Sequence, residues 1–285
     1  MPRWGGWVTP PLNADVRREQ HDATCRLVGF GTPSGLLRSN SSARHWFART
    51  GDVYQFGVAS GRSLRKLVAI YNRTTWGFDS FNGLPPLAPN ESTLLHTSKP
   101  FLSWLPGAFS TAATLPEMPL HSDVRLIRGL FNESLTPTLA AQRGMRPAAY
   151  IDVDADLYAS SYTALDWMFA SKLVRPGTVI GYDDFWVMPC AARDERVFDY
   201  GEARAHAQIT RKYRVRFRCI CGPCAPLRPR DMHVGLRPYF VVEALDAAAP
   251  DAGLAMSRAQ VKAYVRGSAV CKSFVKNGYS VGTTG

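Results

Sequence analysis

The sequence predicts an α/β fold in which helices cover both faces of a doubly wound, parallel sheet. Between residues 52 and 182, five short apolar runs of strand length alternate with helical or loop-rich segments. Several of these runs end on glycine or aspartate. Because open α/β sheets bind ligands beyond the carboxyl ends of their strands, we expect the functional site at that edge of the sheet.

The composition is typical of a globular protein with one main domain. The 285 residues are 46% hydrophobic and 20% charged, with no run of eighteen apolar residues that would predict a membrane span. We expect an irregular or helical extension over residues 1–48, the main domain over 49–245 and a C-terminal extension over 246–285. Residues 1–7 lack the apolar segment of a secretory signal, so a cytoplasmic protein without a membrane partner is expected.

The net charge of +11 would suit an anionic partner such as a nucleic acid or a phosphorylated substrate. A compositional bias spread over the surface would need no such partner. The one dense basic run, residues 211–218, alternates with Val215 and Phe217, as in a strand with one solvated face. Since no nucleic-acid-binding motif accompanies the charge, we expect no nucleic-acid partner.

The six cysteines include one cluster, at Cys219, Cys221 and Cys224. Together with Cys190 or His233 this cluster could hold zinc, although it lacks the paired CxxC spacing of the clearer zinc sites. In the absence of a secretory signal, disulfides are not the default. We therefore expect buried or loop thiols.

The first strand is expected at Asp52–Val58, followed by a tight turn at Ala59–Arg62 and a helix over Ser63–Tyr71. Gly57, at the end of the strand, would let a ligand approach the backbone, and the start of the helix offers free N–H groups. The spacing is not GxGxxG, so this turn alone does not indicate a dinucleotide.

The second strand, Thr74–Asp79, ends on an acid. Asp79 follows the glycine turn by about twenty residues, an offset at which a carboxylate can accept hydrogen bonds from ribose hydroxyls. A cofactor that contains adenosine would satisfy this pattern. Residues 82–123 are rich in proline and have no clear period, which is typical of a lid or another functional loop.

Three further strands are expected at Val124–Ile127, Ala148–Val153 and Thr178–Tyr182, with helices over Ser134–Arg143 and Leu157–Lys172. The last two of these strands run into acidic residues. If they are neighbours in the sheet, their acids surround one crevice.

The acids at these two strand ends are Asp154, Asp156, Asp183 and Asp184. Carboxylates crowded in this way repel one another unless a proton or a cation neutralises them. A hard cation held by oxygen ligands is the simplest remedy. Asp152 lies in the same stretch, and its role is left open.

Outside the five strand units the pattern is weaker. A short helix is expected over Ser41–Arg49, and another over Glu202–Lys212. Two late strands, Arg214–Ile220 and Pro238–Ala244, could pair at an edge of the sheet. A last helix is expected over 257–266, and the Gly-, Ser- and Thr-rich end should fray.

Four motifs occur in the order found in one known family. They are Val53–Ser63, Gly77–Pro85, Val124–Leu135, and the paired acidic segments Asp154–Tyr158 and Asp183–Phe185. Over residues 50–220 the sequence resembles the macrocin O-methyltransferase (TylF-type) family. The members of that family are class I methyltransferases that use S-adenosylmethionine (SAM).

The resemblance implies a Rossmann-like, seven-stranded class I methyltransferase sheet and methyl transfer to a hydroxyl of a small molecule, such as a sugar. To SAM it assigns Gly57, Gly61 and Ser63 at the methionine part, Asp79 and Ser80 at the ribose, and Gly129 and Phe131 near the adenine. To a divalent ion, usually Mg²⁺, it assigns Asp154, Asp183 and Asp184, and it makes Asp156 the general base.

Two positions depart from the family pattern, since Gln55 replaces an acid and Arg62 a common glycine. A non-catalytic protein that binds SAM is therefore one alternative. A glycosyltransferase that holds a metal and a nucleotide sugar through Asp154 and Asp156 is another, which the glycine turn and Asp79 disfavour. The acceptor and the oligomeric state, a homo-oligomer included, are left open by the sequence.

Overall fold

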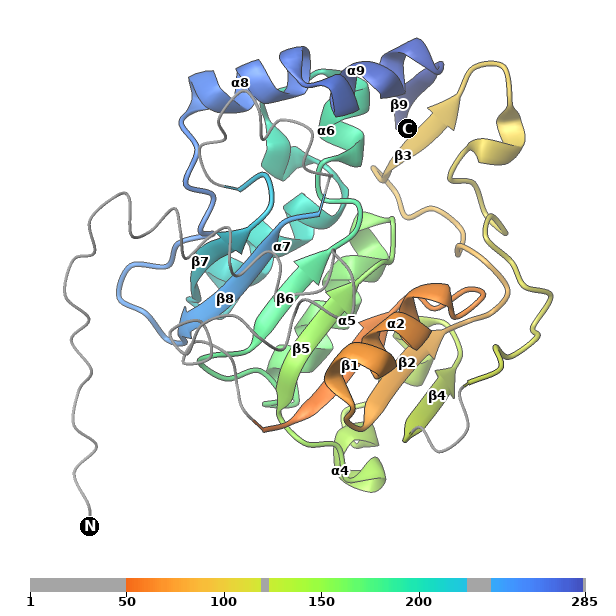
Figure 1. The fold of residues 1–285 in the computed structure, drawn as a ribbon, viewed down its shortest axis with the longest axis vertical. Helices are drawn as coiled ribbons and strands as arrows, with labels where there is room; N and C mark the ends of the chain where they lie inside the picture. The colour runs from red at the N-terminus through yellow and green to blue at the C-terminus, as the bar shows by residue number, and fades with distance from the viewer. Residues whose placement is uncertain (1–49, 119–122, 225–236, 284–285) are drawn as a thin grey trace. The chain divides into compact units, whose positions relative to one another are not determined.

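The computed structural model describes residues 50–118, 123–224 and 237–283, all within one compact unit, Trp46–Gly285. A seven-stranded sheet of order β4-β2-β1-β5-β6-β8-β7 forms its centre (Figure 1). The strands are β1 (Asp52–Phe56), β2 (Thr75–Asp79), β4 (Val124–Arg128), β5 (Ala148–Val153), β6 (Val179–Tyr182), β7 (Arg216–Cys221) and β8 (Tyr239–Ala244). The helix predicted over Ser41–Arg49 lies outside the described residues.

The sheet is parallel from β4 to β6, and this confirms the predicted doubly wound architecture. The two late strands pair with each other at one end of the sheet, as predicted, and β8 lies antiparallel between β6 and the edge strand β7. The strand order reverses between β1 and β5. In open α/β sheets such a reversal leaves a crevice beyond the strand ends, and it places the site at the ends of β1 and β5.

Helices pack against both faces of the sheet. Figure 1 shows α2 in front of the sheet, and α5 and α7 behind it. The helices are α2 (Arg62–Tyr71), α3 (Phe131–Ser134), α4 (Leu139–Arg143), α5 (Tyr158–Ala170), α6 (Val187–Ala192), α7 (Gly201–Lys212), α8 (Arg258–Gly267) and α9 (Ala269–Lys276). The single helix predicted over 134–143 is instead divided into α3 and α4, because Pro137 supplies no N–H to a helical ladder.

The central strands are buried on both faces, as expected for parallel strands between two helical layers. All five residues of β1 and all six of β5 are buried. Polar members of these strands have partners: Asp52, 1% exposed, accepts from the Trp76 Nε1–H at 2.9 Å and from Arg146 Nε at 2.7 Å. The core thus holds the strand ends in fixed positions.

A second, two-stranded sheet was not predicted. β3 (Ser92–His96) pairs antiparallel with β9 (Tyr279–Thr283), and a short 3₁₀ turn, η2 (Pro100–Leu102), follows β3. The expected structureless loop at 82–123 therefore contains a strand, and the expected frayed end forms its partner. Each strand is only five residues long, and neither is stable until the other, far away in sequence, supplies its hydrogen bonds.

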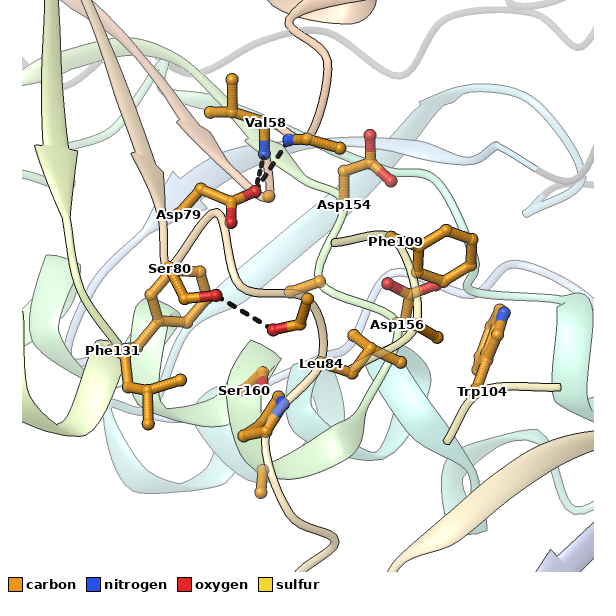
Figure 2. A pocket seen from close by; sticks show the side chains of 18 of the residues that line it. Val58, Asp79, Ser80, Leu84, Trp104, Phe109, Phe131, Asp154, Asp156 and Ser160 are labelled. Atoms are coloured by element: carbon orange, nitrogen blue, oxygen red, sulfur yellow. Dashed lines mark hydrogen bonds between the residues drawn. The ribbon is translucent and has the colours of Figure 1, made fainter. Parts of the chain in front are cut away.

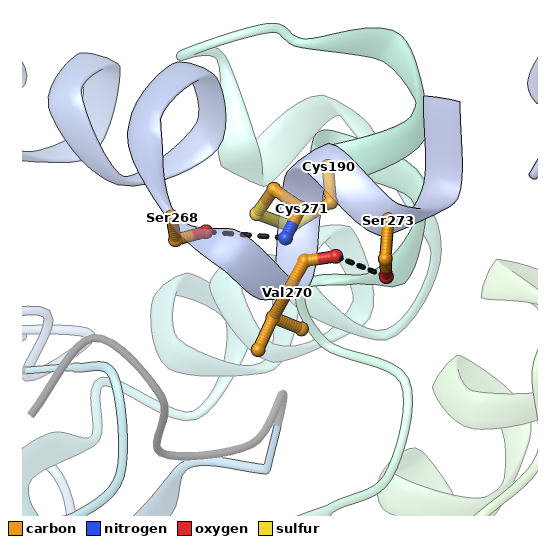
Figure 3. The surroundings of a disulfide bond; sticks show 5 residues. All are labelled: Cys190, Ser268, Val270, Cys271 and Ser273. Carbon is orange, nitrogen blue, oxygen red and sulfur yellow. Dashed lines mark hydrogen bonds between the residues drawn. A yellow bond between two sulfur atoms is a disulfide. The ribbon is translucent and has the colours of Figure 1, made fainter. Parts of the chain in front are cut away.

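Two disulfides correct the prediction of free thiols. Cys190 on α6 is bonded to Cys271 on α9 (Figure 3), and Cys219 is bonded to Cys224. Two of the three sulfurs in the cysteine cluster are therefore disulfide sulfurs and not the thiolates that a zinc site requires. Figure 1 shows α8 and α9 beyond the carboxyl ends of the parallel strands, and the first disulfide attaches this C-terminal segment to α6.

Within the described ranges, no helix combines the length and the apolar character needed to cross a membrane.

Candidate functional site

A cavity of about 690 Å³ opens at the carboxyl edge of the sheet, where the topology places the crevice (Figure 2). Its walls come from the ends of β1, β2, β4, β5 and β6, from the start of α5 and from the loop after β2. A cavity of this size is typical of small-molecule and cofactor sites.

The turn after β1 brings two strands into close contact. Gly57 has φ 89°, and a Cβ at this position would lie 1.7 Å from the carbonyl oxygen of Asp154. The N–H groups of Val58 and Ala59 both donate to Asp79 Oδ2 at 2.7 Å, and Phe81 N–H donates to Oδ1 at 2.6 Å. Asp79 therefore joins the turns after β1 and β2, and its carboxylate lies at the cavity wall (Figure 2).

Five of the seven predicted cofactor residues line the cavity, namely Gly57, Asp79, Ser80, Gly129 and Phe131. The other two are not among its lining residues. Ser63 accepts a hydrogen bond from Gln55 Nε2 at 2.6 Å. Gly61, with φ 74°, is covered by Pro116, whose Cβ would be 2.6 Å from an added methyl group.

Gln55 lies directly below the glycine turn. Its side chain is fully buried, and its Oε1 has no hydrogen-bond partner among the described residues. A buried amide oxygen without a partner is costly, so a donor such as water or a ligand ammonium group would be favourable there. The neutral amide nevertheless lacks the charge that the family's acid would supply.

Three of the predicted metal ligands meet at one point. One carboxylate oxygen from each of Asp154, Asp183 and Asp184 lies within 4.8 Å of the others. Backbone N–H groups of Asp154 and Asp183 extend the sheet hydrogen bonding to Phe56 O and Val153 O, both at 2.9 Å. This all-oxygen set suits Mg²⁺ or a similar hard cation, and β5 and β6 hold it in place.

Electrostatics show how unfavourable this cluster is without a cation. Removal from water raises the pKa of Asp154 to about 7, helped by the nearby charge of Asp152. Burial, with the charges of Asp156 and Asp154, raises the pKa of Asp184 well above its ordinary value. Arg237 forms an ion pair with Asp183 and supplies part of the neutralising charge. A bound divalent cation would favour the ionised carboxylates.

Asp156 differs from Asp154 because the backbone turns between them. Asp156 has φ 58°, so the strand alternation that would put both side chains on one face does not apply. Burial raises the pKa of Asp156 well above its usual range, and the Asp154 charge raises it further. Asp156 hydrogen-bonds to Asp184 and lies at the cavity wall. It is thus next to the proposed metal ligands without being one of the three.

Sequence reasoning missed Glu202, in the first turn of α7. Its side chain is 1% exposed; Oε2 accepts from the N–H of Asp184 at 2.8 Å and Oε1 from that of Ala155 at 3.4 Å. Burial raises its pKa well above the usual value, with the charge of Asp184 as the next cause. Glu202 therefore joins the two acidic turns through their backbones.

Asp152, whose role was open, belongs to a different environment. It accepts a hydrogen bond from the Tyr150 hydroxyl at 2.7 Å and is 5% exposed. Burial raises its pKa. It is absent from the cavity wall.

One wall of the cavity on the side of Asp156 is apolar. Figure 2 shows Leu84, Trp104 and Phe109 on the Asp156 side, whereas Phe131 and Ser80 lie on the Asp79 side. Trp104 is 5% exposed and packs in a cluster with Leu94 of β3. The cavity therefore has a polar half near Asp79 and an apolar wall, formed by Leu84, Trp104 and Phe109, next to the acids.

The sequence pattern of the family described as macrocin-O-methyltransferase (TylF) matches residues 51–211, more than half of the chain. The chain belongs to the macrocin-O-methyltransferase (TylF) family. It is a methyltransferase that uses SAM and methylates oxygen, and the expected class I methyltransferase sheet is confirmed. The glycosyltransferase alternative is thereby set aside. The matched region contains every predicted site residue and Glu202.

Solved structures with a similar fold include an O-methyltransferase from Bacillus cereus in complex with SAH. It is 18% identical, covers 83% of this chain and 94% of its own, and has a TM-score of 0.40. The SAH-bound methyltransferase PaMTH1 of Podospora anserina is 12% identical, with coverage of 84% and 100% and a TM-score of 0.36. Among curated proteins, none matches the chain.

Proposed function

We propose that this methyltransferase depends on a divalent cation, most simply Mg²⁺, and methylates a hydroxyl of a small sugar or natural-product-like acceptor. The observation that carries the proposal is the convergence of Asp154, Asp183 and Asp184 beside the cavity. Three carboxylates this close, with pKa values raised at two of them, are stabilised by a cation that shares them.

The polar half of the cavity suits SAM. Gly57 lines the cavity and lets the backbones of the turns after β1 and β5 approach closely, and Asp79 fixes the turns after β1 and β2. We assign the ribose to Asp79 and Ser80, and the adenine to the wall near Gly129 and Phe131. This places the methyl-bearing sulfonium toward the acids. Gly61 and Ser63 would affect SAM binding through the packing of the turn after β1 and would not contact SAM themselves.

The aspartates at the strand ends would activate the acceptor hydroxyl. When bound to the three aspartates, the cation would lower the pKa of an acceptor hydroxyl and orient its oxygen. Asp156, held at the same edge, would accept the hydroxyl proton on its carboxylate. The acceptor oxygen then bonds to the methyl carbon as the carbon–sulfur bond breaks, which leaves S-adenosylhomocysteine (SAH). Leu84, Trp104 and Phe109 would contact the acceptor's apolar surface and exclude water.

Titration calorimetry tests whether the protein binds the cofactor and Mg²⁺. SAM or SAH should bind in the micromolar range, and Mg²⁺ should give its own signal that is lost in Asp183→Ala while SAH binding remains. A cofactor signal without any Mg²⁺ signal would contradict the metal assignment alone. No cofactor signal under any condition would favour a non-catalytic protein, with Gln55 as the first position to restore to Glu.

Asp156→Asn tests the base. We expect methyl transfer to an acceptor, found by screening hydroxylated sugars and phenols, to fall by about 10²–10⁴-fold, because the amide cannot take the proton. Asp246→Asn is a matched control, since Asp246 is exposed and also left-handed at φ 51°. Unchanged transfer in Asp156→Asn would show that another group removes the proton.

A further inference from the structure

The carboxylate of Glu91 binds the start of α5, 67 residues later in the chain. Its Oε1 accepts from Tyr158 N–H at 2.9 Å, and its Oε2 accepts from Ala159 N–H at 3.1 Å. Glu91 is 1% exposed, although it belongs to the loop between β2 and β3. It is not one of the cavity-lining residues and has no part in the function proposed above.

The start of α5 needs such a partner. Leu157 occupies the N-cap position and provides no side-chain acceptor, so the first N–H groups of the helix depend on an outside group. A carboxylate at this end also interacts favourably with the helix dipole. Arg204 of α7 lies 4.0 Å from the centre of the Tyr158 ring and partly offsets the cost of burying the Glu91 charge.

Glu91 connects two parts of the site. On one side, α5 begins two residues after Asp156, so the cap restrains the turn in which Asp156 is left-handed. On the other side, Glu91 immediately precedes β3. The backbone N–H of Trp104 donates to the backbone oxygen of Leu94 in that strand at 2.7 Å. The Thr93 hydroxyl donates to Trp104 O. A single buried side chain thus joins the strand that holds Trp104, one residue of the apolar wall, to the acidic turn.

We propose that Glu91 is a positioning residue, which holds the apolar wall of Leu84, Trp104 and Phe109 in register with Asp156. Its role in catalysis rests on the proposed function, since it requires Asp156 to meet the acceptor. Its role as a connection between loop and helix stands on the geometry alone. An ordinary helix cap would stabilise α5 and would leave the loop and the acceptor unaffected.

Hydrogen exchange followed by mass spectrometry tests the connection. The variants are Glu91→Gln, which keeps one carbonyl acceptor and loses the charge, and Glu91→Ala. The control is Glu117→Gln, an exposed glutamate in the segment between η2 and β4. In both Glu91 variants we expect about tenfold faster exchange at the start of α5 and across residues 84–105, with the Ala variant more affected. Faster exchange at α5 alone would reduce Glu91 to a local cap and overturn the proposal.

Kinetics then test the effect on the reaction. Once an acceptor is identified for the wild type, we expect Glu91→Gln to raise the KM for the acceptor and to lower kcat/KM by about tenfold. The reason is that a displaced apolar wall would bind the acceptor less tightly, and a displaced Asp156 would be less well aligned with its hydroxyl. The SAH dissociation constant should change by less than about threefold, because the cofactor half of the cavity is built mainly on β1, β2 and β4. Unchanged acceptor kinetics with faster loop exchange would overturn the positioning role. If wild-type protein transfers no methyl group, the proposed function fails while the exchange result still decides the connection.

Discussion

Asp154 and Asp156 are two residues apart, and the backbone angle φ of Asp156 gives their side chains different positions in the site. The left-handed conformation of Asp156 costs about 1–2 kcal/mol for a residue with a Cβ, less for aspartate, which tolerates it better than most residues. The core that buries β5 on both faces can hold that conformation in place. Asp156 therefore lies outside the row of proposed metal ligands while it stays beside them. Backbone geometry, and not residue type, distinguishes the proposed ligand from the proposed base.

Glu202 offers a prediction at this scale. In Glu202→Gln we expect Mg²⁺ affinity to fall by about tenfold, because the amide can accept only one of the two backbone N–H groups that the carboxylate now binds. The turns that carry Asp154 and Asp184 would then be less firmly spaced. Titration of Mg²⁺ into the variant, beside Glu117→Gln as an exposed control, measures the change. Wild-type affinity in the Gln variant would show that the spacing does not depend on Glu202.

The strand-end acids could be predicted from the sequence, whereas Glu202 and Glu91 could not. An acid that ends a parallel strand has a position given by topology, since all such ends lie at one edge of the sheet. Glu202 resembles an ordinary first-turn acid of a helix, and Glu91 an ordinary loop residue. Their partners are backbone N–H groups of distant turns, which leave no pattern in the sequence. The burial of both side chains is what reveals them.

At the scale of elements, the C-terminal segment supports the apolar wall of the cavity. β9 supplies the only partner strand that β3 has among the described elements, and Phe274, Tyr279 and Val281 pack on the cluster that contains Trp104. The disulfide between α6 and α9 holds the segment in place, and Ser268 caps α9 by accepting from the Cys271 N–H (Figure 3). This segment lies outside the region that matches the family.

The two disulfides should differ in their contribution to stability. Cys190 and Cys271 are 81 residues apart, and Cys219 and Cys224 are 5 apart. In the chain-entropy account, loss of the long-range bond costs about 4.5 kcal/mol of unfolding free energy, and loss of the short one about 2 kcal/mol. Urea denaturation of the Cys190→Ser/Cys271→Ser and Cys219→Ser/Cys224→Ser proteins gives both values. A larger loss in the second pair would contradict the entropic explanation.

Sequence reasoning also failed for strands whose partners are far away in the chain. β1 and β5 are fully buried, and their mainly apolar pattern predicts them directly. β3 and β9 are as short as β1 but contain more polar residues, and each depends on the other across most of the chain. The pairing of Cys190 with Cys271 is hidden for the same reason, because these partners meet only after α6 and α9 have packed.

At the scale of the whole molecule, two buried titratable groups make the free energy of unfolding depend on pH, with opposite signs. His206 is fully buried between the Tyr182 hydroxyl at 2.7 Å and Ala252 O at 2.8 Å. Burial lowers its pKa from 6.5 to about 4. The unfolded chain therefore binds a proton first as the pH falls below 6.5, and folding loses about 3 kcal/mol by pH 4. Asp154 has the opposite effect. Its pKa in the folded protein is about 7, so its contribution to the free energy of unfolding is fully present below pH 4 and is lost as the pH rises through 7.

We therefore expect the two effects to oppose each other between about pH 4 and 6.5 in the metal-free protein, and stability to fall as the pH rises from 6.5 through 7. Mg²⁺ should restore stability on the alkaline side, where it replaces the protons of the acidic cluster. Thermal melts from pH 4 to 9, with Mg²⁺ or with a chelator, measure both effects. Without the His206 effect, His206→Gln should gain stability as the pH falls from 6.5 to 4. An alkaline limb that Mg²⁺ leaves unchanged would separate the cluster from cation binding.

The whole-molecule topology was predictable because five strand–helix units alternate and parallel connections have a fixed hand. The insertion of β8 between β6 and β7 was not, since two strands that follow one another can pair in either order at the end of a sheet. The site depended on the parallel part alone. Its position followed from the sequence, while the acceptor wall and its supports did not.

The pairing of β3 with β9 has a consequence for the protein during its synthesis. β3 leaves the ribosome about 190 residues before β9, which at typical elongation rates is an interval of about 10–40 s. Through that interval the nascent chain can complete the cofactor half of its sheet while β3 has an open edge, and open edges invite pairing with other chains. Translation thus completes the strands around the cofactor half of the cavity first, and the C-terminal segment that packs on the cluster of Trp104 last.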